Sequence, residues 1–289
     1  MRIGIGLPNT VPGTPGGRLV DWAREAEAAG FHTLSTIGRV VFPTHDEFIS
    51  LAAAAAVTSK IELFSNVTVA TLFDPVILAR QAASLDQISN GRFVLGMAVG
   101  WNPNDFAVVG RGFHDRGKRL DADLEVMEAI WRGDSVNGSI KLVGPTPTNG
   151  SSVPVAFGGN VPASFARVAK HGIGWTAGGS TPDQAVEAFG QTRTAWEAAG
   201  RTGQPRFWAL TYYGLGDDAQ AIGETYLSDY YGDWGPGMAA GMPTSAEAVL
   251  GAVEAYKGTG TETLIFNPSN NDLGQVEALH TALGGKTEF

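Results

Sequence analysis

The chain has 289 residues, of which 43% are hydrophobic and 17% are charged, a balance typical of a compact globular protein and unlike that of a disordered one. Its formal net charge of -9, without any cluster of Lys and Arg, argues against a nucleic-acid-binding protein. The absence of cysteine excludes disulfides, thiolate zinc sites and thiol nucleophiles.

The N-terminal segment, MRIGIGLPNT, holds an apolar run that is too short for the core of a signal peptide. The most apolar stretch, Leu51 to Val57, is mostly alanine, and no window approaches the roughly 18 uninterrupted apolar residues of a membrane-spanning helix. We therefore expect a cytoplasmic protein that has no membrane partner.

Short strand-like segments alternate with longer helical patterns along the chain, which is typical of βα units and a parallel sheet. The predicted strands are Ile3–Leu7, Thr33–Ile37, Glu62–Val69, Phe93–Val99, Val153–Phe157, Gly174–Ala177, Arg206–Leu215 and Thr263–Asn267. Eight strands, each followed by a helix, predict a (β/α)8 TIM barrel of the α/β class. An open doubly wound sheet is the alternative.

The predicted helices are Gly17–Ala29, His45–Ser59, Val76–Ser89, Asp115–Arg132, Pro162–Lys170, Pro182–Ala199, Asp217–Tyr231, Ser245–Gly258 and Leu273–Leu283. Asp74-Pro75 and Thr181-Pro182 each place a capping side chain before a proline, as is typical of a helix start. Two loop-like segments interrupt the regular spacing: a short insertion after the fourth strand, Asp134–Ser152, and the glycine-rich Gly232–Thr244. Because no linker divides the chain, we expect residues 1–289 to form a single domain.

The residues that follow the predicted strands are the place to look for a functional site, because the active site of such a barrel lies at the carboxyl ends of its strands. These positions hold glycines, amides and aromatic residues, and almost no carboxylate or histidine. They suit a large planar polar ligand, whereas the nucleophile with its base, or the paired carboxylates, of a hydrolase are missing. Asp74 is the only acid near a strand end, and we interpret it as a helix cap.

Gly158, Gly159 and Asn160 form one candidate site, because the backbone N–H groups exposed by a glycine pair at a helix entrance can bind an anion. An ordinary loop with Asn160 as the helix N-cap explains the same residues equally well. Among the histidines, His114 precedes the helix after the fourth strand and could reach the pocket. No histidine pair has the spacing of a metal site, so we predict none.

The order of several motifs resembles the bacterial luciferase-like monooxygenase superfamily, whose members are (β/α)8 barrels that use reduced flavin mononucleotide (FMN) or the deazaflavin coenzyme F420. The most specific motifs are Asp74-Pro75-Val76, Ala79-Arg80-Gln81, Leu85-Asp86-Gln87, Ser89-Asn90-Gly91-Arg92-Phe93, Leu95-Gly96 and Gly100-Trp101-Asn102. Downstream, Arg116-Gly117, Trp131-Arg132-Gly133, Phe157-Gly158-Gly159 and Gly174-Trp175 follow in the family's order. The resemblance spans nearly the whole chain.

The resemblance implies roles for particular residues. The glycines of the fourth strand would let the isoalloxazine ring lie against the backbone, and a non-proline cis peptide would press on the ring from the third strand, at Asn66–Val67. The residues implied to bind the cofactor are Asn66, Val67, Thr68, Gly100, Trp101, Asn102, Gly158, Gly159, Asn160, Gly178 and Gly179. Those expected to line the substrate pocket are Asn9, His114 and Tyr212.

One departure from the family concerns the end of the second strand. Many relatives carry an acidic residue and a histidine there, or two histidines, whereas this chain has Gly38-Arg39-Val40, which puts the family's usual acid–base role in doubt. Arg39 could act in catalysis as an electrostatic clamp, because a guanidinium stays charged and donates to anionic oxygens. A solvated loop charge is the alternative. A second departure, the small size of the insertion Asp134–Ser152, predicts an open pocket.

The resemblance implies a flavin-type oxidoreductase that acts on a small organic substrate. It would be either a monooxygenase in which reduced FMN, supplied by a separate flavin reductase, activates O2, or an F420-dependent hydride-transfer enzyme. The alternative is a non-catalytic flavin-binding or accessory barrel, which the missing acid–histidine pair supports. We also expect a homodimer through the helices of the second and third βα units, where the alanine run Ala52–Ala56 permits close contact.

Overall fold

The computed structural model describes residues 1–289 and is a closed barrel in which eight parallel strands follow one another in chain order. The strands are β1 (Arg2–Gly6), β2 (Thr33–Thr36), β3 (Glu62–Val69), β4 (Phe93–Ala98), β5 (Val155–Gly158), β6 (Gly174–Gly178), β7 (Arg206–Tyr213) and β8 (Thr263–Pro268). β8 pairs with β1 and closes the ring. The predicted (β/α)8 barrel is confirmed, and the open sheet is wrong.

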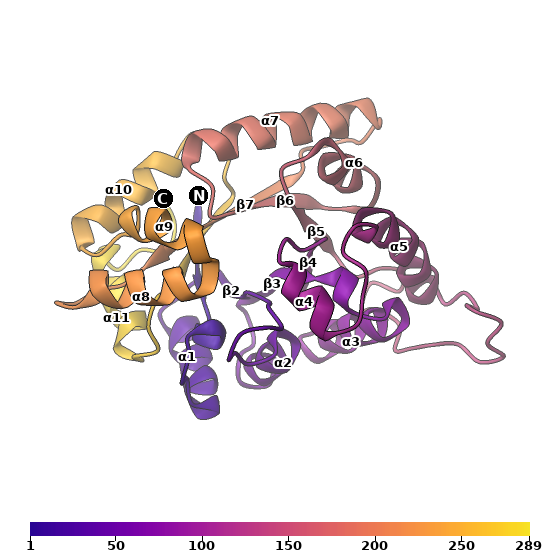
Figure 1. The fold of residues 1–289 in the computed structure, drawn as a ribbon, viewed down its shortest axis with the longest axis horizontal. Coiled ribbons are helices and arrows are strands. Elements are labelled where there is room, and N and C mark those ends of the chain that lie inside the picture. Colours follow the sequence, from indigo (N-terminus) through magenta and orange to yellow (C-terminus); the bar gives the residue numbers. More distant parts are fainter.

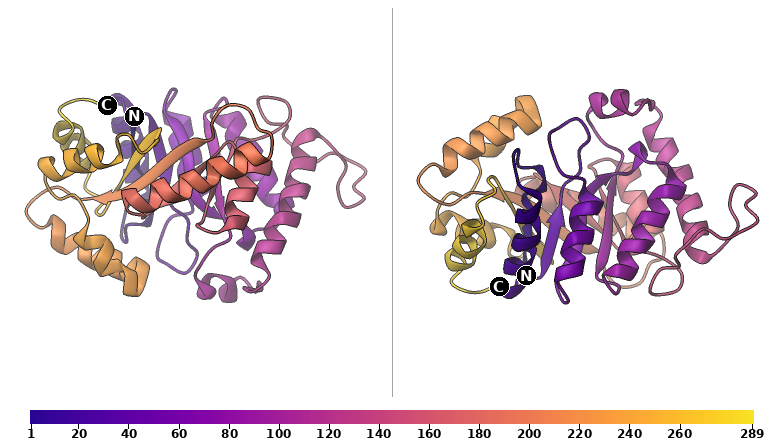
Figure 2. Two further views of the ribbon diagram at one scale, coloured as in Figure 1. Left: turned by 90° about the horizontal axis from the view of Figure 1, so that it is seen from above. Right: turned by 90° about the horizontal axis from the view of Figure 1, so that it is seen from below.

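The helices form a layer outside the strands (Figures 1 and 2). They are α1 (Gly16–Ala28), α2 (Glu47–Val57), α3 (Pro75–Ile88), α4 (Pro103–Val108), α5 (Arg116–Arg132), α6 (Pro162–His171), α7 (Pro182–Ala198), α8 (Ala219–Tyr231), α9 (Gly235–Ala240), α10 (Ala246–Tyr256) and α11 (Gly274–Ala282). Three short 3-10 helices, η1 (Pro8–Thr10), η2 (Ala70–Leu72) and η3 (Gly232–Trp234), extend strand or helix ends. The barrel helices match the predicted ones to within about two residues.

Side-chain caps explain where several of these helices begin. Asp74 Oδ1 accepts hydrogen bonds from the backbone N–H groups of Val76 and Ile77 at 2.9 and 3.2 Å, so its predicted role as a cap is confirmed. Thr181 and Gln184 form a complete capping box at the start of α7. Two short helices, α4 and α9, were not predicted, because a single turn carries no apolar periodicity and α9 lies in the glycine-rich segment expected to be a loop.

Two apolar layers hold the barrel together. The larger lies between strands and helices, and a smaller cluster of Phe64, Val94, Ala156, Trp208 and Ile265 fills the barrel interior. Towards the amino ends of the strands, the guanidinium of Arg206 donates to the carboxylates of Glu62 and Glu262, at distances from 2.8 to 3.3 Å. Side chains therefore fill the barrel interior towards the amino ends of the strands, and a ligand can enter only from the carboxyl ends.

The insertion after β4 projects from the side of the barrel as a loop between α5 and β5 (Figure 2). The buried carboxylate of Asp86 in α3 holds it, accepting hydrogen bonds from the backbone N–H and the hydroxyl of Thr148 at 2.6 and 2.7 Å. No helix of the structure is both long enough and apolar enough to span a membrane.

Candidate functional site

The upper interior of the barrel, at the carboxyl ends of the strands, is polar. The hydroxyl of Thr176 on β6 donates to Asn66 Oδ1 on β3 at 2.8 Å, and because these strands are not neighbours this bond crosses the interior. Buried polar atoms at this level that have no hydrogen-bond partner include Ser35 Oγ, Asn66 Nδ2 and Asn267 Oδ1. Buried polar groups are normally paired, so these atoms mark a place suited to a polar ligand.

The peptide bond between Asn66 and Val67 is cis, as the family resemblance implies. The register of β3 against β4 shifts between Ser65 and Thr68 at this point. Asn66 is buried, whereas Val67 is partly exposed at the mouth and Thr68 is fully buried.

The glycines of β4 and its following turn serve the packing of the protein itself, which corrects the expectation that they open space for a ring. A Cβ atom on Gly96 would lie 2.1 Å from the Ser65 carbonyl oxygen and 2.7 Å from the Phe64 ring. One on Gly100, whose φ is +78°, would lie 2.4 Å from Val69 Cγ1. Both places are already filled by neighbouring residues.

The glycines that follow β5 and β6 differ among themselves. A Cβ atom on Gly178 would meet nothing within 4 Å, and one on Gly158 would make only ordinary contacts. By contrast, a Cβ atom on Gly159 would lie 2.7 Å from Ser164 Oγ, and one on Gly179 would lie 2.7 Å from the Met238 methyl group. Asn160 is exposed and does not cap α6, whose N-cap is Val161. Gly178 is thus the open position of this rim.

An aromatic group spans the mouth, which we call the aromatic bridge and define as Trp101, Tyr231 and Trp234. The Trp101 ring lies 5.1 Å from the Trp234 ring and stacks on Tyr231 at 6.5 Å between centroids. Trp101 follows β4, whereas Tyr231 and Trp234 come from the end of α8 and from η3. The bridge joins opposite sides of the rim.

Arg39 lies against this bridge and is not a solvated loop charge, since its side chain is only 12% exposed. Its guanidinium carbon lies 5.3 Å from the Trp101 ring centroid and 5.1 Å from that of Tyr230, within cation–π range. It also donates a hydrogen bond to the Tyr230 carbonyl oxygen and forms an ion pair with Asp105, with 3.8 Å between Nε and Oδ2. Arg39 therefore links the loops after β2 and β4 to α8.

Two buried carboxylates near the mouth correct the expectation that it holds almost no acid. Asp105 in α4 is 3% exposed, and its Oδ1 accepts a hydrogen bond from the Val41 N–H at 2.7 Å. Glu47, the first residue of α2, is 7% exposed. Neither follows a strand directly, so a search restricted to strand ends misses both. An acid at the start of a helix normally indicates only a favourable interaction with the helix dipole.

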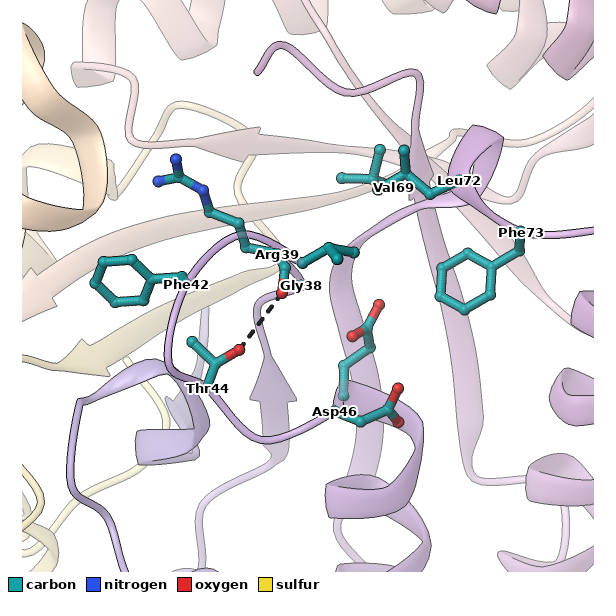
Figure 3. Close-up of a pocket in the computed structure, with 10 residues that line it drawn as sticks. Gly38, Arg39, Phe42, Thr44, Asp46, Val69, Leu72 and Phe73 are labelled. Carbon is teal, nitrogen blue, oxygen red and sulfur yellow. Dashed lines mark hydrogen bonds between the residues drawn. The ribbon is translucent and has the colours of Figure 1, made fainter. Parts of the chain in front are cut away.

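Glu47 lines a cavity of about 200 Å³ at the rim between β2 and β3. Arg39 and Phe42 form one wall, and Val69, Leu72 and Phe73 form the opposite wall (Figure 3). A Cβ atom on Gly38 would lie 2.6 Å from Glu47 Oε1, so only glycine there leaves room for the carboxyl group. Burial raises the pKa of Glu47 to about 7, and the nearby Asp46 carboxylate adds to this rise.

A second cavity, of about 880 Å³, lies on the other side of the bridge, beside β6 and β7. Its walls include Gly179, Ser180 and Thr181 at the entrance to α7, Tyr212 on β7, and Trp234. The Tyr212 hydroxyl hydrogen-bonds that of Tyr231 at 2.8 Å, and burial raises the pKa of Tyr212 well above its usual range. No Lys or Arg lines this cavity.

Three other predicted site residues, Asn9, Asn102 and His114, line neither cavity. Asn9 is fully buried, and its Nδ2 donates to the carbonyl oxygens of Ile37 and His45 at 2.9 and 3.3 Å, so its amide is occupied by the protein. Asn102 caps α4. His114 is exposed and lines neither cavity, whereas the adjacent Phe113 packs against Phe106. The structure does not bring Asn9 or His114 to an open pocket.

The sequence and the fold are both similar to those of known proteins. Residues 1–274 match the family described as luciferase-like monooxygenase. An uncharacterized protein of Mycobacterium tuberculosis is 33% identical over 180 residues, which cover 58% of this chain and 61% of that protein. The chain thus matches about three fifths of the length of this relative.

Two solved structures share the barrel over nearly their whole length. An F420-dependent secondary alcohol dehydrogenase, solved with an F420–acetone adduct, has a TM-score of 0.81 at 16% identity and covers 99% of both chains. The oxygenating constituent of 3,6-diketocamphane monooxygenase from Pseudomonas putida, solved with FMN, has a TM-score of 0.75 at 19% identity, over 99% of this chain and 97% of that one. At such identities the likeness concerns the fold alone.

Proposed function

The chain belongs to the luciferase-like monooxygenase family, and we propose that it is a flavin-type oxidoreductase that uses reduced FMN or F420 on a small organic substrate. The observation that carries this proposal is the cavity of about 880 Å³ at the carboxyl ends of β6 and β7. Its size falls in the range of roughly 300–1,000 Å³ that is usual for small-molecule sites. Solved structures with this fold hold FMN or an F420 adduct, which supports a cofactor of one of these two kinds.

The residues around this cavity fit such a cofactor. The hydroxyls of Ser180 and Thr181, which line the cavity, and the open position at Gly178 just before it would hold the tail, with backbone N–H groups as donors where no basic side chain is present. Trp234, the member of the aromatic bridge that lines the cavity, would cover the ring, and the unpartnered Asn66 Nδ2 in the barrel interior is a further candidate donor. When bound, the cofactor supplies hydride transfer or the activation of O2, while the protein binds it, orients the substrate and excludes water.

The surroundings of Arg39 weigh against the alternative of a non-catalytic accessory barrel. A chain without chemistry has no need of a guanidinium held over an aromatic bridge, or of the buried acids Glu47 and Asp105 beside it, because burying charges costs free energy. The direct test is a titration of the purified protein with FMN and with F420, each oxidised and reduced, followed by absorbance. Binding of neither cofactor contradicts the proposed function.

Gly178→Val is expected to weaken cofactor binding at least about ten-fold, because the larger side chain enters space that is open in the protein alone. The same openness predicts that the thermal unfolding midpoint changes little. Gly190 in α7 also has no neighbour within 4 Å of a Cβ position, but it is exposed in the middle of the helix, away from the strand ends, so Gly190→Val is the matched control. Equal affinities of the two variants would argue against a cofactor at Gly178.

A homodimer through α2 and α3 is part of this proposal. A shallow groove between these helices exposes Ile49, Ile77 and Ile88 at 71%, 49% and 53%. Exposed apolar patches of this kind commonly mark protein interfaces. Ile49→Glu together with Ile88→Glu should therefore convert a dimer to a species of 30.3 kDa in sedimentation velocity. Wild-type protein that sediments only as this species would contradict the dimer.

A further inference from the structure

The larger cavity contains a single charged side chain, that of Asp233. No Lys, Arg or His is among the 20 residues that line it, so this carboxylate has no basic partner in the cavity. Asp233 and Trp234 are successive residues of η3 at the mouth, and both are exposed, Trp234 to 61%. The cavity therefore presents an unpaired negative charge beside an accessible indole ring.

The chain segments that carry the cavity lining, residues 172–192 and 207–256, contain no Lys, Arg or His. Their nine acidic residues are Asp183, Glu187, Asp217, Asp218, Glu224, Asp229, Asp233, Glu247 and Glu254. The chain has 29 acidic residues and 20 Lys and Arg residues in all, so the net charge of -9 belongs to these two segments. Because charges of one sign around a cleft concentrate ligands of the opposite sign, this cavity favours cations.

The aromatic bridge shows directly that its rings accept a cation. The Arg39 guanidinium carbon lies 5.3 Å from the Trp101 ring centroid, and Asp105 pairs with this guanidinium from the other side. Trp234, which contacts Trp101 at 5.1 Å between centroids, has no such cation on its ring. The face of an indole ring attracts ammonium groups, so Trp234 and the adjacent Asp233 carboxylate provide the two elements that hold an organic ammonium ion.

The rest of the lining fits an apolar group attached to that ammonium ion. Half of the 20 lining residues are hydrophobic, and they include Met238 and Met242 from the segment around α9 and Ala248 and Ala252 from α10. In Figure 1 α8, α9 and α10 lie together on one side of the barrel. Methionine side chains adapt to apolar groups of different shapes.

We propose that the substrate is an organic ammonium compound with an apolar group, and that Asp233 and Trp234 bind its charged end. This proposal rests on the proposed function. Trp234 is the residue expected to cover the cofactor ring, so a ligand held there lies at the ring end of the cavity. The bound cofactor brings the negative charge of its phosphate into a cavity that has no basic side chain, and a cationic substrate balances that charge.

The test uses three small molecules that share a benzyl group: benzyltrimethylammonium, which is cationic at every pH, neutral benzyl alcohol and anionic phenylacetate. Saturation-transfer NMR with the whole chain measures each Kd. At about 50 mM salt benzyltrimethylammonium should bind at least about ten-fold more tightly than benzyl alcohol, and phenylacetate should bind most weakly. The difference should shrink at about 500 mM salt, because ions screen an exposed charge.

Asp233→Asn should raise the Kd of benzyltrimethylammonium at least about five-fold and leave that of benzyl alcohol unchanged, since only the cation depends on the carboxylate. Asp229→Asn is the matched control, because it removes the same charge from an exposed position of α8 that does not line the cavity. It should change the Kd less than about two-fold. Equal effects of the two variants would mean that only a diffuse field acts, and would overturn the site at Asp233.

The remaining outcomes separate distinct failures. Benzyl alcohol or phenylacetate that binds as tightly as the cation, or a failure of all three to bind, overturns the substrate class. FMN and F420 are then added in turn, and a cofactor that binds should lower the Kd of benzyltrimethylammonium. Competition between them overturns the role of the cation as substrate. If the cation binds as expected but neither cofactor does, the proposed function fails while the cation site stands.

Discussion

Gly96→Ala is expected to lower the free energy of unfolding by about 3 kcal/mol, near the upper end of what overpacking a filled interior usually costs. The added methyl group would lie 2.1 Å from the Ser65 carbonyl oxygen and 2.7 Å from the Phe64 ring. The first of these is a backbone atom of the neighbouring strand, so the contact can be relieved only by separating β3 from β4. Urea unfolding followed by circular dichroism measures the change.

The control for this prediction is Gly190→Ala in α7. This glycine is exposed in the middle of a helix and has open space around its Cβ position, so alanine there should raise the free energy of unfolding by about 0.5–1 kcal/mol. A Gly96→Ala protein as stable as the wild type would mean that the β3 backbone at Ser65 can move away from β4 without a loss of stability.

Glu47→Gln is expected to make the folded protein more stable relative to the wild type as pH rises, by up to about 3 kcal/mol. Burial raises the pKa of Glu47 from an ordinary value of 4.5 to about 7, so between these values the folded state binds a proton that the unfolded chain has lost. The wild-type protein therefore loses stability as pH rises from about 4.5 to 7 and changes no further above that. Each pKa unit corresponds to about 1.4 kcal/mol.

Glutamine cannot ionise, so this loss should be absent from Glu47→Gln. The measurement is the difference in unfolding free energy between variant and wild type in urea at pH 4.5, 6 and 8. The difference should grow between pH 4.5 and 8 and should grow little more at higher pH. Asp46→Asn, which removes the neighbouring carboxylate that adds to the rise in the pKa of Glu47, should keep a pH-dependent loss of stability that is smaller than that of the wild type. Parallel curves for Glu47→Gln and the wild type would show that folding does not raise the pKa of Glu47.

Much of the fold could be predicted because the relevant signals are local. Strand and helix periodicity, together with caps such as Asp74 and Thr181, located all eight strands and the barrel helices to within about two residues. The family motifs added the cis peptide at Asn66–Val67, which no local pattern indicates. The candidate site was predicted less well, because a list of residues after strands shows which residues are near the mouth but not which of them already contact the protein.

Particular residues illustrate this limit. Asn9 follows β1, and its position in the sequence suggests a side-chain amide available to a ligand. In the structure that amide donates hydrogen bonds to carbonyl oxygens of the loop after β2. Gly100 looks like space for a ligand, yet the Val69 side chain occupies it. Arg39 could equally have been solvated, and only its contacts with Asp105 and Trp101 show that it is held in the mouth.

The sequence by itself determined the alternation of strands and helices, the number of eight units and the family, because these depend on short-range periodicity and on motifs that are continuous in the chain. Only the tertiary structure decided that Glu47 occupies the space left by Gly38, that Asp105 reaches Arg39, and that the glycines of β4 are filled while Gly178 is open. The physical reason is that each of these contacts joins separate segments, and whether such segments meet depends on strand register and barrel closure, which no local pattern encodes.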